Sequence, residues 1–219
     1  MDREYFEREL RELRNCVGRM GDLVCARLET CLRALPGRDQ ARMRFVLRHD
    51  EEINALQIEI DDRALRLLAA GQPTAVDLRF IIAAIRANAD LERIGDQAVN
   101  VAGAALQIIG GPELAHEPLV VDMGWSSLSM VRDALAAFLE RNVELAHSVL
   151  ERDDDIDAMK RRVLRDLIAL MAQEPGLIER AISLVFISRS FERVADHATN
   201  VAEGAIFLVE AKDVRHHHQ

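Results

Sequence analysis

Two stretches of the chain, one hundred residues apart, carry two acids and an amide at intervals of four. They are Glu92, Asp96 and Asn100 in the first copy, and Glu192, Asp196 and Asn200 in the second. Over 92–105 and 192–205, eight of fourteen positions are identical. Side chains four residues apart on a helix lie one above another. Each copy therefore predicts a ladder of oxygen ligands along one helical stripe.

A second matched pair of polar stretches precedes each ladder. Asp50 is followed four residues later by Asn54, and Asp153 is followed by Asp157 at the same spacing. If the helices that carry these pairs pack antiparallel against the ladders, the oxygens of each half face one another. Such a pocket suits magnesium, manganese, calcium or carboxylate-bound iron, whereas zinc usually takes His or Cys ligands. The spacing thus predicts one cation site in each half.

Two other interpretations of these acids stay open. An acid pair on a helix is commonly a solvated face, and Arg93 and Arg193 could pair with the acids instead of a metal. Carboxylate-bridged di-iron bundles use Glu-x-x-His, a string that occurs at 113–116 and at 144–147. The first string lies in a stretch rich in Pro and Gly, and the second lies on a wholly polar stripe. An oxidase of this type is therefore disfavoured.

The elements that must position these ladders are predicted to be long helices. The chain is 49% hydrophobic and 4% aromatic, with few Pro and Gly residues and no run of alternating β-branched residues that would favour a sheet. Apolar periodicity predicts helices over 4–35, 39–70, 75–109, 123–150, 153–172 and 177–211. The fold class is all-α, a duplicated pair of three-helix bundles over residues 1–110 and 118–215, joined by a linker at 111–117.

Charge and hydropathy exclude several classes of function. The formal net charge is −9, which argues against nucleic acid as the main partner because binding phosphates requires a basic face. The longest apolar stretches, 80–85 and 181–188, are much shorter than the roughly 20 residues of a membrane span. The three cysteines share one predicted helix without CxxC spacing, which indicates reduced, packed thiols of a cytoplasmic protein.

The doubled motif resembles the signature of the PhoU family. The residues that carry the likeness are 90–96 with Asn100, and 191–203, supported by 77–79 and 213–216. The resemblance implies two pseudo-symmetric three-helix bundles, a homodimer, and multinuclear metal sites. It also implies a cytoplasmic, non-enzymatic role in phosphate homeostasis. Such proteins act with the ATPase subunit of the phosphate ABC transporter and a phosphate sensor histidine kinase to repress the phosphate-starvation response, and meet the membrane only through these partners.

The resemblance also assigns metal ligands residue by residue. They are Asp50, Glu92, Asp96, Asp153, Asp157, Glu192 and Asp196, with Asn100 and Asn200 as weaker additions. The expected metals are magnesium, manganese or iron, with zinc or calcium as alternatives. The chain departs from the family pattern at Asn54, which weakens the first site, and at Ser190, which replaces the acid that matches Asp90. The alternatives to this function are a carboxylate-bridged metal-dependent enzyme and a metal-free helical adaptor.

Overall fold

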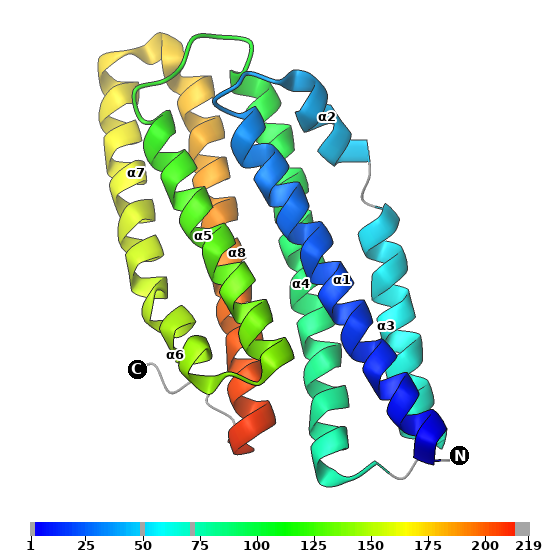
Figure 1. Cartoon of the computed structure of the whole chain (residues 1–219). Helices are drawn as coiled ribbons and strands as arrows, with labels where there is room; N and C mark the ends of the chain where they lie inside the picture. The colour runs from blue at the N-terminus through cyan, green and yellow to red at the C-terminus, as the bar shows by residue number, and fades with distance from the viewer. Residues whose placement is uncertain (1–2, 49–50, 71–72, 213–219) are drawn as a thin grey trace.

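The computed structural model describes residues 3–48, 51–70 and 73–212, and every regular element within them is helical. Six long helices run alongside one another, and two short helices, α2 and α6, lie near opposite ends of the molecule (Figure 1). In chain order the elements are α1 (Arg3–Ala34), α2 (Gln40–Arg48), α3 (Glu51–Ala70), α4 (Ala75–Ile108), α5 (Glu117–Glu140), α6 (Val143–Glu151), α7 (Asp153–Gln173), the 3-10 turn η1 (Pro175–Leu177) and α8 (Ile178–Glu210). The all-α duplicated architecture predicted from the sequence is confirmed.

The two halves share one hydrophobic core. Helix α4 packs along α8, and α1 packs against α5, so the last helix of each half lies at the centre of the molecule. The sequence explains this position, because α4 and α8 carry apolar residues on nearly every side and therefore need neighbours all round. The proposed domain limits of 1–110 and 118–215 stay a prediction.

The predicted helix over 39–70 corresponds to α2 and α3, and the junction between them, residues 49–50, lies outside the described residues. The break between α5 and α6 makes the predicted helix over 123–150 wrong as a single element. Its cause is local, since Arg141 has φ 58° and the Asn142 side chain accepts a hydrogen bond from Leu145 N at 3.0 Å. Asn is a favoured N-cap residue, so the sequence did contain this signal.

Helix α5 begins at Glu117, earlier than the predicted start at 123. A proline in the first turn of a helix is well tolerated, and Pro118 occupies that position. Glu117 is nearly fully buried, accepts a hydrogen bond from Leu114 N at 3.0 Å, and pairs with Arg38 at 2.7 Å. This buried ion pair joins the start of the second half to the turn that follows α1.

Two glycines allow α1 and α5 to approach closely. A Cβ atom on Gly124 would lie 2.4 Å from Leu32 Cδ2 and 2.7 Å from Phe191 Cζ, and one on Gly21 would lie 2.5 Å from Leu135 Cδ1. Such distances are shorter than van der Waals contact. The packing between the halves therefore depends on the absence of side chains at these two positions.

We expect Gly124→Ala to lower the free energy of unfolding by about 1–3 kcal/mol, because the added methyl group overpacks the core. The measurement is urea unfolding followed by circular dichroism. Gly103→Ala in α4 is the matched control, since no atom lies within 4 Å of its added Cβ, and it should instead stabilise by roughly 0.5–1 kcal/mol. Equal effects of the two substitutions would contradict the close-packing explanation.

Candidate metal centres

In the second half, the four predicted acidic ligands come from two adjacent helices. Asp153 and Asp157 lie in the first turns of α7, and Glu192 and Asp196 lie one turn apart on α8. Helices α7 and α8 pack against each other, so the two pairs of carboxylates belong to one surface. The i,i+4 spacing read from the sequence produces this arrangement.

The pKa of Asp196 shows that these carboxylates influence one another. Partial burial of the carboxyl group, followed by repulsion from Glu192 and Asp153, raises its pKa from 3.8 to about 6, with a smaller contribution from Asp157. His197 opposes the shift. Repulsion of this kind requires proximity, so the four acids lie within electrostatic reach of one another. A bound cation would relieve the repulsion.

A lysine already provides part of that relief. Lys160 Nζ lies 2.5 Å from Glu192 Oε1 and 3.6 Å from Asp157 Oδ1, and the hydrogen bond to Glu192 raises the pKa of the lysine. Sequence reasoning missed this residue. Its signal was present, because Lys160 follows Asp153 by two helical turns and therefore lies on the same stripe.

In the first half, two of the predicted acidic ligands lie on α4. Glu92 and Asp96 lie one turn apart on α4, and Arg93 pairs with both of them, at 3.5 Å and 3.3 Å. This is the arginine pairing that the sequence left open as an alternative. Asp50 lies outside the described residues. Asn54 lies on α3, which packs against α4.

Both predicted asparagine ligands lie at the contact between α4 and α8. Asn200 Nδ2 donates to Asp90 Oδ1 at 2.9 Å, and His197 Nδ1 lies 2.9 Å from the same oxygen. Asn100 Nδ2 donates to Gln97 Oε1 at 3.3 Å. These contacts also give Asp90 a role that the sequence did not predict, since its carboxylate joins the two halves. Metal coordination by either asparagine stays a prediction.

The part of the chain that the structure describes contains no group of three or more His, Cys, Asp or Glu side chains arranged to hold a metal ion. The donor set nevertheless has the right chemistry, because it consists of carboxylate oxygens, which hard cations prefer. The competing Glu-x-x-His string gains no support. Glu144 and His147 are both exposed on α6.

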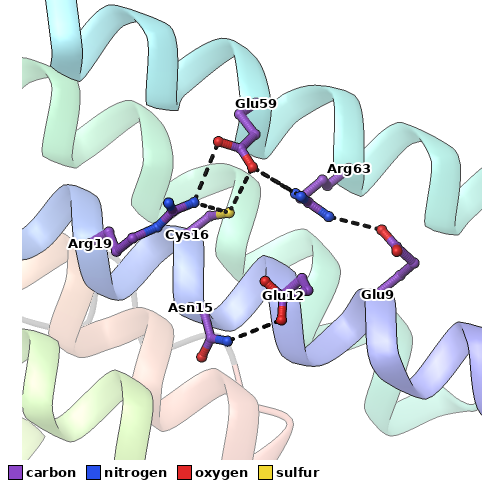
Figure 2. Close-up of polar contacts among 7 residues, drawn as sticks. All are labelled: Glu9, Glu12, Asn15, Cys16, Arg19, Glu59 and Arg63. Carbon is purple, nitrogen blue, oxygen red and sulfur yellow. Dashed lines mark hydrogen bonds and ion pairs between the residues drawn. The ribbon is translucent and has the colours of Figure 1, made fainter.

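The three cysteines are buried in α1 and are free thiols. Burial raises the pKa of Cys25 to about 11 and that of Cys31 to about 12. The Cys16 thiol donates to Glu59 of α3 at 3.4 Å, and Arg63 of α3 pairs with Glu9 of α1 at 2.9 Å. Figure 2 shows both contacts between the two helices. These contacts hold α1 against α3, as expected for packed rather than reactive thiols.

Hydropathy along the helices agrees with the sequence-based expectation about membranes. Within residues 3–48, 51–70 and 73–212, no helix has both the length and the apolar character needed to cross a bilayer.

The raised pKa of Asp196 predicts a pH dependence of stability. Because the folded protein binds this proton more tightly than the unfolded chain does, the free energy of unfolding should fall as the pH rises from 3.8 to about 6. Thermal unfolding of the wild type and Asp196→Asn, both in EDTA, measures the effect. The variant should lose the part of the pH dependence that comes from Asp196. Identical pH profiles of the two proteins would contradict the raised pKa of Asp196.

The chain is similar to known proteins over nearly its whole length. The model of the PhoU domain matches residues 17–105 and 120–205. The phosphate-specific transport system accessory protein PhoU homolog of Clostridium acetobutylicum is 34% identical over 217 residues, which is 98% of each chain. The homolog of Pseudomonas putida is 39% identical over 214 residues, covering 97% of this chain and 84% of the relative.

Solved structures show the same likeness. The crystal structure of PhoU from Pseudomonas aeruginosa has a TM-score of 0.91 at 36% identity, covering 94% of this chain and 100% of the other. The phosphate transport system regulatory protein PhoU from Streptococcus pneumoniae has a TM-score of 0.88 at 32% identity, covering 95% and 99%. The duplicated helical motif, the fold and the full-length similarity agree, and the chain belongs to the PhoU family.

Proposed function

We propose that this protein is a metal-binding, cytoplasmic regulator of phosphate homeostasis. It acts with the ATPase subunit of the phosphate ABC transporter and with a sensor histidine kinase to repress the phosphate-starvation response. The observation that carries the proposal is the nearly full-length likeness to proteins named as accessory to phosphate-specific transport. A relative of the same fold is named a regulatory protein of phosphate transport, which favours a regulator over an enzyme.

The acids of each half support the metal part of the proposal. Asp153, Asp157, Glu192 and Asp196 would hold the cation of the second half. Asp50, Glu92 and Asp96 would hold that of the first. Burial, followed by repulsion from the other acids of the second half, already raises the pKa of Asp196, so a divalent cation would stabilise this surface. The bound metal would supply a fixed positive charge and connect the helices that carry its ligands.

One observation favours a second candidate, the metal-free adaptor. The ammonium group of Lys160 lies 2.5 Å from Glu192 and neutralises part of the acid group without any ion. In that case the helical surfaces alone would contact the transporter and the kinase. A homodimer is compatible with either candidate, because a twofold dimer requires only one self-complementary surface on the chain.

Metal analysis separates the two candidates. Protein purified without chelators should carry magnesium, manganese or iron, and Glu92→Gln/Glu192→Gln should lose most of it, because an amide binds hard cations less strongly than a carboxylate. Elemental mass spectrometry gives the metal-to-protein ratio. Glu7→Gln is the control, since Glu7 is exposed on α1 and, within the described part of the chain, its ion pair is the local one with Arg3.

The Lys160→Met substitution should change metal retention in the opposite direction. Removal of the ammonium group takes away the competitor for Glu192, so metal retention should increase in this variant. A wild-type protein that carries no metal, together with a Lys160→Met variant that also carries none, would leave the adaptor as the correct candidate.

The regulatory part of the proposal predicts a cellular phenotype. Deletion of the gene should raise alkaline phosphatase activity in phosphate-rich medium, because repression of the starvation response is lost. The wild-type gene restores repression, and the Glu92→Gln/Glu192→Gln gene tests whether the metal is needed. A deletion strain that stays repressed would exclude this function.

A further inference from the structure

The contact between α4 and α8 contains two hollows related by the internal duplication. The first includes Asp90 and Asn200 in its lining, and the second includes Ser190 and Asn100. Four lining residues of one hollow have counterparts one hundred positions away in the other: Arg86 and Phe186, Asp90 and Ser190, Asn200 and Asn100, and Gly204 and Ala104. In these pairs, an arginine and a carboxylate of the first hollow correspond to a phenylalanine and a serine hydroxyl in the second.

In the first hollow, the chain supplies its own anion. The carboxylate of Asp90 accepts a hydrogen bond from Asn200 at 2.9 Å and lies 2.9 Å from His197 Nδ1. Donors on α8 are thereby satisfied by an acid on α4. This arrangement shows what the amide at this position binds when an anion is present.

The second hollow has the donors without the acid. Its volume is about 340 Å³, and its polar lining consists of two amides, a hydroxyl and two guanidinium groups, from Gln97, Asn100, Ser190, Arg189 and Arg193. Gln97 and Ser190 are largely buried. The lining contains no carboxylate. Among the described residues, the Ser190 hydroxyl has no hydrogen-bond partner.

The two arginines also lack ion-pair partners among the described residues, although the chain has 37 acidic and 28 basic residues. The counterpart of Arg193 in the first half behaves differently, since Arg93 pairs with Glu92 and Asp96. Arg189 and Arg193 are one turn apart on α8, where like charges repel. An anion between them would remove this repulsion.

We propose that the second hollow is a binding site for a phosphate group, either inorganic phosphate or a phosphate monoester. Guanidinium groups bind phosphate oxygens through paired, charge-assisted hydrogen bonds. The Gln97 amide and the Ser190 hydroxyl supply further donors from buried positions. The oxygens of Gln97 and Ser190 can also accept a hydrogen bond. A protonated phosphate oxygen can donate such a bond, whereas sulfate carries no proton and cannot. The lining includes Asn100 but none of the acids proposed to hold a metal.

Titration calorimetry of the full chain tests the site, with inorganic phosphate and phosphoserine as separate ligands at low ionic strength. The protein is measured as purified and after EDTA treatment, because phosphate held by a metal would be lost with the metal, whereas phosphate held by the hollow would remain. Saturable binding is expected to persist in EDTA. Binding of phosphoserine alone would identify a phosphorylated molecule as the source of the phosphate group.

Two variants and a control locate the binding. Arg189→Ala/Arg193→Ala should weaken binding by about tenfold or more, since two charge-assisted contacts are lost. Ser190→Asp should abolish binding while the protein stays folded by circular dichroism, because the new carboxylate takes the place of the ligand, as Asp90 does in the first hollow. Arg165→Ala, an exposed arginine on α7, should bind as the wild type does.

Three results would overturn the proposal. The first is that neither inorganic phosphate nor phosphoserine binds saturably. The second is that both hollow variants bind with the affinity of the wild type. The third is that sulfate competes for the site as strongly as phosphate does. None of these results depends on whether the protein binds metal or represses the starvation response, so the site and the proposed function fail independently.

Discussion

The packing of α4 against α8 is the constraint on which the rest of the structure depends. These two helices lie at the centre, carry both copies of the repeated motif, and are buried on most sides. A central helix has few positions left for polar groups. The acids of α8 lie toward α7, whereas its amide lies toward α4, so one motif serves two different neighbours.

Polar groups at a buried contact must find partners, because an unpaired buried polar atom costs about 1–3 kcal/mol. The two hollows at the contact between α4 and α8 differ in how their polar groups are paired. In the first hollow, the Asp90 carboxylate contacts Asn200 and His197 across the helices. In the second, the corresponding residue is Ser190, which provides no carboxylate for Asn100. Duplication thus produced two similar surfaces, and single substitutions gave them different chemistry. The acid group near Asp196 shows a related asymmetry, since Lys160 lies within it, where the first half has Gln57.

Much of the fold could be predicted because helical periodicity and duplication are both visible in one sequence. The two central helices were expected at 75–109 and 177–211 and occur as Ala75–Ile108 and Ile178–Glu210. Helix ends were predicted less well where an N-cap residue sets them, as at Asn142. The apolar periodicity continues through this position, but the side-chain hydrogen bond of Asn142 starts a new helix there. The early start of α5 is accompanied by a buried ion pair between Glu117 and Arg38, two residues that are distant in sequence.

The sequence by itself determined the all-α class, the twofold repeat and the acids that could bind a cation, because these follow from residue type and from spacing along one helix. Only the tertiary structure decided which groups meet. It placed Lys160 among the acids of the second half and directed Asn200 to Asp90. It also brought Arg189 and Arg193 together with Gln97. The first pairing joins consecutive helices of one half, whereas the other two join α4 and α8 across the two halves. All of them depend on how helices pack against one another, which no local pattern encodes.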